Sequence, residues 1–235
     1  MKYAFFGTPI FAAIILEKLV KAGIPPALVV CNPDKPSGRK KALSSPPAKE
    51  IAQKYGLKIW QPETLDPEKI REFDFAIVAA YGKILSKEFL NALPGKFIGV
   101  HPSLLPKYRG ASPIQSAILN GEKETGISLF ILDEKVDHGS ILIREELEIR
   151  NENFENLLRR LAELSGDLLI KTLPEFAKGK IKPRPQNDAE ATYSKKFSAD
   201  DGFVKSEDLE AARSGESAEA AIKIFRKILA LNPEP

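Results

Sequence analysis

Residues 75–100 read FAIVAAYGKILSKEFLNALPGKFIGV, in which two short apolar runs flank a helical pattern. The runs are FAIVAA at 75–80 and FIGV at 97–100, and the helical pattern lies between Ser86 and Leu93. Apolar runs this short and continuous are typical of strands that are covered on both faces, as in a parallel sheet. The stretch therefore predicts a parallel strand–helix–strand unit.

The same alternation extends to both sides of this unit. The further expected strands are YAFF (3–6), ALVV (27–30), 125–131 and 141–149, and the further expected helices cover 11–20, 47–54, 113–119 and a long apolar stripe from Phe154 onward. Alternating strands and helices predict an α/β fold with a Rossmann-like, doubly wound, mostly parallel sheet. The last two strands are expected to pair at an edge of that sheet.

Composition divides the 235 residues into three segments. Residues 1–183 are expected to form the α/β domain, which would hold the catalytic site. Residues 184–217 turn polar, lack strand signals and are interpreted as a linker. Residues 218–235 carry apolar residues at helical spacing and are interpreted as the start of a truncated C-terminal region.

The overall composition is that of an ordinary globular protein, with 43% hydrophobic and 29% charged residues. It excludes fibrous and long disordered classes. No apolar stretch near the N-terminus approaches the ~20 residues that span a bilayer, and no signal-peptide cleavage site follows it. The single cysteine, Cys31, cannot form an internal disulfide, and no metal-ligand pattern is visible. We therefore expect a monomeric, cytoplasmic protein with neither a metal nor a membrane partner.

The net charge of +3 is small but unevenly distributed. Between Cys31 and Glu50 there are five basic and two acidic residues, and Arg39, Lys40 and Lys41 are consecutive. Most such runs, when they are rich in Gly, Ser and Pro, are solvated surface loops. The alternative is that these three cations contact the phosphate backbone of a nucleic acid.

The candidate catalytic residues lie near the two histidines of the chain, His101 and His138. Ligands of open parallel sheets bind beyond the carboxyl ends of the strands, and His101 directly follows the expected strand FIGV. Asp137 precedes His138 in the motif VDHGSIL, so its carboxylate could orient the His101 imidazole for acid–base chemistry. The alternative is structural, with a histidine that ends a strand and an aspartate that turns a loop.

A longer pattern favours the catalytic interpretation. The string HPSLLPKYRGASPIQSAILNGEKETGISLFILDEKVDHGSIL at 101–142 resembles the folate-dependent formyltransferases, and among them those that formylate methionyl-tRNA. The similarity also covers FFGTPIFA at 5–12, NPDKPSGRKKALSSPPAKEIA at 32–52, AAYGKIL at 79–85 and ATYSKKFS at 191–198. It implies an enzyme of translation initiation that passes the formyl group of 10-formyltetrahydrofolate to the amino group of methionyl initiator tRNA.

The resemblance also implies roles for individual residues. By this similarity, His101 stabilises an oxyanion or moves a proton, and Asp137 holds the imidazole and assists removal of the amine proton. Folate contacts are implied for Tyr81, Gly82, Ser103, Leu104, Leu105 and Pro106. Contacts to tRNA phosphates are implied for Arg39, Lys40 and Lys41. No metal and no covalent nucleophile are implied.

The sequence departs from the family pattern two residues before His101. The family has an asparagine there, whose amide donates to the developing oxyanion, whereas this chain has Gly99. Loss of one such donor costs about 100- to 1000-fold in turnover. Three interpretations stay open: a backbone N–H or a water replaces the amide, the chain is a weak enzyme or a non-catalytic folate- or tRNA-binding relic, or the glycine was introduced to trap a complex.

The acceptor and the C-terminus leave further alternatives. In the family, a segment like ALNP at 230–233 leads into a small β-barrel domain that helps to hold tRNA, and we expect that domain to be missing or truncated here. A related enzyme that formylates a sugar amine or another small amine is the second hypothesis. The basic run at 38–41 favours tRNA, whereas the short C-terminal region mildly favours a small acceptor.

Overall fold

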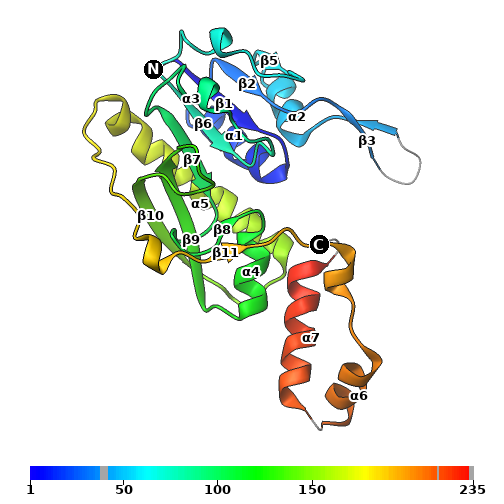
Figure 1. Cartoon of the computed structure of the whole chain (residues 1–235). Coiled ribbons are helices and arrows are strands. Elements are labelled where there is room, and N and C mark those ends of the chain that lie inside the picture. The colour runs from blue at the N-terminus through cyan, green and yellow to red at the C-terminus, as the bar shows by residue number, and fades with distance from the viewer. Residues whose placement is uncertain (38–41, 216, 233–235) are drawn as a thin grey trace.

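The computed structural model describes residues 1–37, 42–215 and 217–232, and its main element is a seven-stranded sheet. The strands are β1 (Tyr3–Gly7), β2 (Leu28–Val30), β5 (Ile59–Trp60), β6 (Phe75–Ala79), β7 (Phe97–His101), β9 (Glu124–Ile131) and β10 (Ile141–Glu148). Their order is β10-β9-β7-β6-β1-β2-β5, and each is parallel to its neighbours except at the β7–β9 and β9–β10 pairs. The predicted doubly wound, mostly parallel sheet with an antiparallel edge is confirmed (Figure 1).

The chain reverses its direction across the sheet beside β1. From β1 it runs outward to β2 and β5, and it then returns to β6 on the other side of β1 and continues to β7. Ala4 of β1 lies opposite Leu28 of β2 and Ala76 of β6. At such a reversal a crevice opens beyond the carboxyl ends of the strands, and this is where open α/β sheets bind their ligands.

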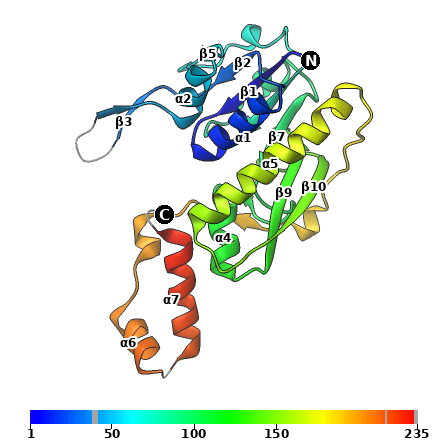
Figure 2. The same cartoon turned by 180° about the vertical axis from the view of Figure 1, so that it is seen from behind.

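Helices cover both faces of the sheet. They are α1 (Ile10–Lys21), α2 (Pro47–Lys54), α3 (Lys87–Leu90), α4 (Pro113–Asn120) and α5 (Phe154–Ala177). Figure 2 shows α1 and α5 packed side by side across one face, where they contribute to the larger hydrophobic core. The other face carries a smaller core around Phe6, Phe89 and Phe97, whose ring centroids lie 5.8 to 6.3 Å apart. Within the described residues, no helix is long and apolar enough to cross a bilayer.

The long helix expected from Phe154 onward is confirmed as α5, and a side chain caps its first turn. The side-chain oxygen of Asn153 accepts a 3.0 Å hydrogen bond from the Asn156 N–H and caps the first turn. The helix contains Pro174 and ends at Ala177. Near this end the ring of Phe176 lies edge-on to Phe75 of the sheet, with centroids 5.7 Å apart.

Several short elements were not predicted. A hairpin of β3 (Lys35–Ser37) and β4 (Ala42–Ser44) projects from the body of the molecule (Figure 1). Strand β8 (Arg109–Gly110) pairs in parallel with β11 (Tyr193–Ser194), so the interval 184–217 that was interpreted as a linker contains a strand. Strands of two or three residues are too short to produce a recognisable apolar run.

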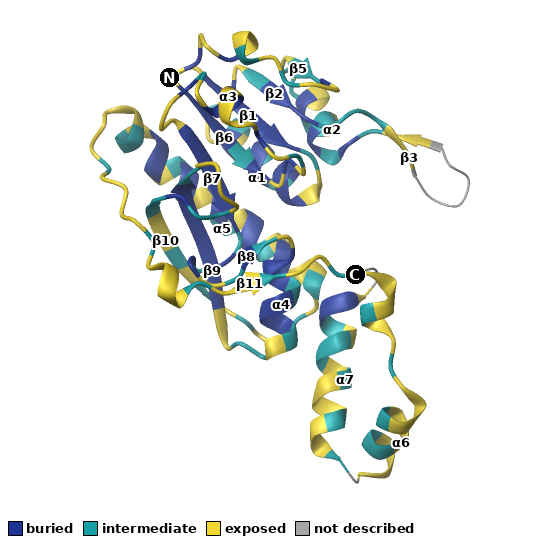
Figure 3. Cartoon of the chain, in the orientation of Figure 1, coloured by how far each residue is buried: buried dark blue, intermediate teal, exposed yellow. Residues whose placement is uncertain are grey.

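The C-terminal helices form a hairpin that extends away from the sheet (Figure 1). Helix α6 (Ser206–Ser214) packs on α7 (Ala218–Leu231), and α7 also contacts α4. Figure 3 shows α7 buried at its C-terminal end and more exposed along the rest of its length. Ala230 and Leu231 are buried, whereas Phe225 in the middle of the helix is half exposed. The helix expected from the apolar spacing is confirmed, and the division into a domain over 1–183, a linker and a truncated C-terminal region stays a prediction.

Candidate active site

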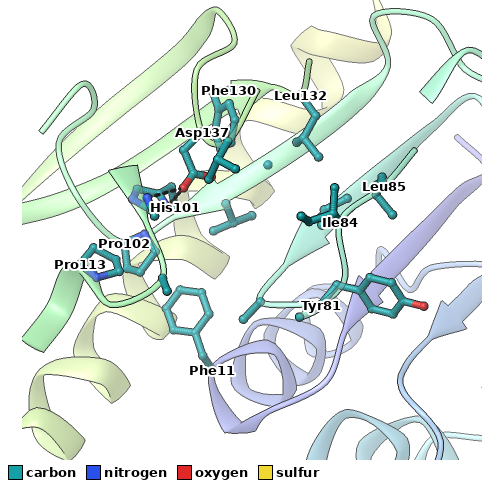
Figure 4. Close-up of a pocket in the computed structure, with 18 of the residues that line it drawn as sticks. Phe11, Tyr81, Ile84, Leu85, His101, Pro102, Pro113, Phe130, Leu132 and Asp137 are labelled. Atoms are coloured by element: carbon teal, nitrogen blue, oxygen red, sulfur yellow. Dashed lines mark hydrogen bonds and ion pairs between the residues drawn. The ribbon is translucent and has the colours of Figure 1, made fainter. Parts of the chain in front are cut away.

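A cavity of about 620 Å³ opens beyond the carboxyl ends of β6 and β7 (Figure 4). Three stretches supply much of its wall: residues 80–85 after β6, residues within 110–115 around the start of α4, and residues 132–137 after β9. Large apolar side chains among its lining residues include those of Phe11, Ile84, Leu85, Phe130 and Leu132. This volume lies within the range of about 300 to 1,000 Å³ that small-molecule sites occupy. The cavity therefore coincides with the crevice that the sheet topology predicts.

The loop after β6 is shaped by an unusual backbone. Ala80 adopts a left-handed conformation with φ 48°, and Gly82 follows with φ 81°. The carbonyl oxygen of Tyr81 between them accepts hydrogen bonds from Thr8 Oγ1 at 3.1 Å and from Asn32 Nδ2 at 2.9 Å. Because both donors come from loops that follow neighbouring strands, the turn is fixed across the reversal point of the sheet.

The imidazole of His101 is held by a backbone carbonyl. His101 ends β7 and is buried, and its Nε2 lies 2.8 Å from the carbonyl oxygen of Tyr108. A carbonyl oxygen can only accept, so Nε2 carries the hydrogen and donates it. Tyr108 turns its carbonyl toward the ring through a left-handed backbone with φ 58°. The other ring nitrogen, Nδ1, is then free for chemistry and faces Asp137.

Asp137 lies against this second nitrogen. Its Oδ2 is 3.5 Å from Nδ1 of His101, and the two side chains point toward one another in Figure 4. The same Oδ2 accepts a 2.8 Å hydrogen bond from the backbone N–H of Gly110. A proton on Nδ1 would be bound between an imidazole and a carboxylate, which is a charge-assisted arrangement. The two residues are thus placed to hold and move one proton at the cavity wall.

The second histidine belongs to a separate cluster. Nδ1 of His138 lies 2.6 Å from Oδ2 of Asp133, and its Nε2 lies 3.3 Å from Oδ2 of Asp188. His138 is absent from the cavity wall. Of the two histidines, the structure therefore brings His101 together with Asp137 and gives His138 other partners.

Gly99 lies in the wall of the cavity with a bulky residue directly across from it. It pairs with Val78 of β6 on one side and with Phe130 of β9 on the other. A Cβ atom added to Gly99 would lie 2.4 Å from Cε1 of Phe130 and 2.6 Å from Cδ1 of Leu132. Apolar side chains therefore fill the volume that a side chain at residue 99 would need.

The residues expected to contact folate fall into two groups. Tyr81 and Gly82 line the cavity, although Figure 4 shows the Tyr81 ring pointing away from His101. Ser103 to Pro106 are absent from the lining and form a turn next to it, in which Ser103 Oγ donates to the carbonyl oxygen of Lys107 at 2.5 Å. Their roles in folate binding stay predictions.

The residues expected to contact tRNA cannot be placed in the same way. Arg39, Lys40 and Lys41 lie outside the described residues, between β3 and β4. Their role also stays a prediction.

Two other reactive side chains follow strands at this edge of the sheet. Cys31 is buried just after β2, and burial raises the pKa of its thiol to about 11. Burial also raises the pKa of the Tyr81 hydroxyl to about 12. Both groups stay protonated near neutral pH, so neither provides a thiolate nucleophile or a general base.

Sequence reasoning missed three features that position the pair. They are the N–H of Gly110, the carbonyl of Tyr108 and the segment around Gln186, whose side chain bonds the backbone of Asp137 at 2.8 Å. Two of them are backbone groups, which leave no trace in residue type. The third lies 49 residues from Asp137, and no spacing rule connects the two.

An open, doubly wound α/β sheet with a His–Asp pair in the wall of an apolar cavity defines an enzyme-like protein that binds a small molecule at the carboxyl edge of its strands. The chain belongs to the formyl transferase family, whose model matches residues 1–173. The resemblance expected from the sequence is thereby confirmed.

Relatives and solved structures agree with this assignment. The methionyl-tRNA formyltransferase of Kosmotoga olearia is 41% identical over 242 residues, which cover 100% of this chain and 74% of that protein. The methionyl-tRNA formyltransferase of Thermodesulfovibrio yellowstonii is 45% identical over 207 residues, covering 85% of this chain and 67% of that protein. The N-formyltransferase of Helicobacter canadensis, solved with folinic acid and dTDP-3-aminofucose, superposes with a TM-score of 0.71 at 19% identity, covering 98% of this chain and 80% of that one. At that identity the superposition shows the fold alone.

Proposed function

We propose that the chain transfers the formyl group of 10-formyltetrahydrofolate to the amino group of methionyl initiator tRNA, as a cytoplasmic monomer. The observation that carries this proposal is the His101–Asp137 pair in the cavity wall, in a chain 41% identical over its whole length to a methionyl-tRNA formyltransferase. The catalytic region is proposed to be residues 1–183. The cavity beside the pair has an apolar wall and a tightly turned backbone loop, which suit a folate better than a free ion.

The cavity supports binding of the formyl donor. A pterin ring needs an apolar wall with a few polar groups to orient it. The side chain of Ile84 is 86% exposed beside the cavity although it is large and apolar. A bound ring would cover such a side chain and remove its apolar surface from water. We assign donor contacts to the 80–85 loop and, through the neighbouring turn, to residues 103–106.

The chemistry that the pair can perform follows from its geometry. The acceptor amine attacks the formyl carbon, a C–N bond forms, and negative charge develops on the formyl oxygen. Asp137 is placed to take the proton that the amine loses, and His101, when it carries a proton on both nitrogens, is placed to stabilise the charged oxygen through its positive charge. The bond from the formyl carbon to the folate nitrogen then breaks, and the proton passes to that nitrogen.

The position of Gly99 predicts a lower turnover. No side chain at residue 99 can donate to the charged oxygen, and Phe130 occupies the space beside it. Removal of one oxyanion donor costs about 100- to 1000-fold in turnover. We therefore expect a working enzyme that is slower than relatives with an amide at this position.

The test is formyl transfer from 10-formyltetrahydrofolate to methionyl initiator tRNA, with a dTDP-linked amino sugar as the competing acceptor. Formylation of the tRNA alone would support the proposal. Formylation of the sugar alone would assign the chain to small-amine transfer. Folate binding without transfer to either acceptor would assign it a binding role.

A further inference from the structure

Residues 186–194 run along the edge of the active site, beyond the part of the chain that the family model matches. Strand β11 at their end pairs with β8, and β8 contains Gly110, which bonds Asp137. We propose that Gln186 in this segment is a positioning residue that holds Asp137 against the His101 imidazole, an inference that rests on the proposed function.

The backbone on either side of His138 is tied to one side chain. Nε2 of Gln186 donates a 2.8 Å hydrogen bond to the carbonyl oxygen of Asp137 and another 2.8 Å hydrogen bond to that of Gly139. Asp137 adopts a left-handed backbone with φ 49°, which a non-glycine residue holds only when its surroundings fix it. The two hydrogens of a single amide nitrogen supply that constraint.

The orientation of the Gln186 amide is itself fixed. Its Oε1 accepts hydrogen bonds from Nε of Arg109 at 3.1 Å and from Nη2 at 2.8 Å. Arg109 is buried, and its Nη2 also contacts Asp188 Oδ1 at 2.8 Å. A guanidinium can only donate, so the amide oxygen must face Arg109 and the amide nitrogen must face the two carbonyls.

Both ends of Asp137 are thereby tied to the same short strand. Its carboxylate is bound by the N–H of Gly110, and its backbone is bound through Gln186 to Arg109, the other residue of β8. Gln186 is absent from the cavity lining, so it acts on the reaction through the residues that it holds, of which Asp137 belongs to the pair. A displacement of a catalytic group by about 1 Å costs on the order of 100-fold in rate.

A Gln186→Glu variant tests the proposal. Glutamate keeps the length of the side chain and an oxygen for Arg109, but it replaces the amide donor with an acceptor that faces two carbonyls. We expect kcat to fall on the order of 100-fold, while KM for 10-formyltetrahydrofolate changes less than about 3-fold. The matched control is Glu190→Gln, because Glu190 lies in the same segment and its side chain, among the contacts of the described residues, bonds only the Asn187 side chain, at 2.8 Å.

A general loss of stability would give a different pattern. Equal losses of kcat and folate binding, or a kcat within 3-fold of that of the unmodified chain, would overturn the positioning role. Gln186→Met provides a second, uncharged variant of similar length, and it should reproduce the kcat loss if Gln186→Glu does not fold.

A separate readout distinguishes this inference from the proposed function. If the unmodified chain transfers no formyl group, the proposed function fails, and hydrogen exchange of the backbone amides of residues 133–139 decides the positioning role. Faster exchange in Gln186→Glu than in the unmodified chain and Glu190→Gln would support it. Unchanged exchange would overturn it.

Discussion

The ring of Phe130 occupies the space beside Gly99, the residue directly opposite it in the β7–β9 pair. A Cβ atom on Gly99 would lie 2.4 Å from Cε1 and 2.6 Å from Cζ of that ring. An aromatic residue that covers a glycine on the neighbouring strand compensates for the missing side chain. Residues 99 and 130 therefore pack as one unit, and the effect of a substitution at one should depend on the side chain at the other.

Introducing the family's asparagine at residue 99 should consequently not raise turnover unless Phe130 is replaced by a smaller side chain. We expect Gly99→Asn alone to destabilise the chain by about 1–3 kcal/mol through overpacking, without a gain in turnover. Gly99→Asn with Phe130→Val should recover part of the stability and raise turnover above that of either single variant. Urea unfolding and formyl transfer of all four forms constitute a double-mutant cycle, for which we expect a coupling of about 0.5–3 kcal/mol. Additive effects would contradict this account of the pair.

The proposed role of Asp137 predicts a separation of catalysis from binding. In Asp137→Asn the amide oxygen can still accept the hydrogen bond from Gly110, so the loop should keep its conformation. The charge beside Nδ1 of His101 is lost, and with it the acceptor for the amine proton. We expect kcat to fall by about 100- to 10,000-fold, the range for a positioned general base. The dissociation constant for 10-formyltetrahydrofolate, measured by calorimetry, should change little, and a parallel loss in both would exclude the catalytic role.

The sheet was predictable because its strands are continuous apolar runs between helical patterns. The carboxyl ends of the expected strands indicated where the cavity lies, and His101 could be named because it directly follows the apolar run FIGV and is the last residue of β7. Asp137 could be named as a possible partner from its place in the VDHGSIL loop, but choosing the catalytic over the structural interpretation required the family resemblance.

The supports of the pair could not be predicted. The contact of Gly110 with Asp137 spans 27 residues, and that of Gln186 spans 49. Neither contact leaves a hydrophobic pattern in the sequence, because one partner in each is a backbone group. The packing of Phe130 on Gly99 depends on the register of β7 and β9, which the sequence specifies only through the fold as a whole.

One carboxylate outside the cavity lining makes the stability of the folded chain depend on pH. The ammonium of Lys54, 2.8 Å from Glu17, and a further hydrogen bond from Tyr55 hold the pKa of the Glu17 carboxyl at about 2, below the usual 4.5. A lowered pKa stabilises the folded chain above pH 4.5, and this contribution is lost as the pH falls from 4.5 through about 2.

Glu17→Gln should therefore lower the free energy of unfolding at pH 6 and have a smaller effect at pH 3. Urea denaturation at the two pH values measures the difference from the unmodified chain. Glu68→Gln is the control, because its ion pair with Arg71 is exposed and contributes little at either pH. An equal effect of Glu17→Gln at pH 6 and pH 3 would show that its ion pair does not stabilise the fold in this way.

The basic run of Arg39, Lys40 and Lys41 predicts how tRNA binding depends on salt. Each phosphate contact releases counterions and adds about 0.7 to 0.9 to the slope of log K against log salt concentration. If all three residues contact phosphates, changing them together to alanine should reduce that slope by about 2 to 3 and weaken binding at low salt. The matched control changes three lysines that follow the end of α5, at 178, 180 and 182, so that the net charge falls equally. Slopes reduced equally in the two triple variants would mean that the run acts only through overall charge, and slopes left unchanged in both would place the tRNA contacts elsewhere.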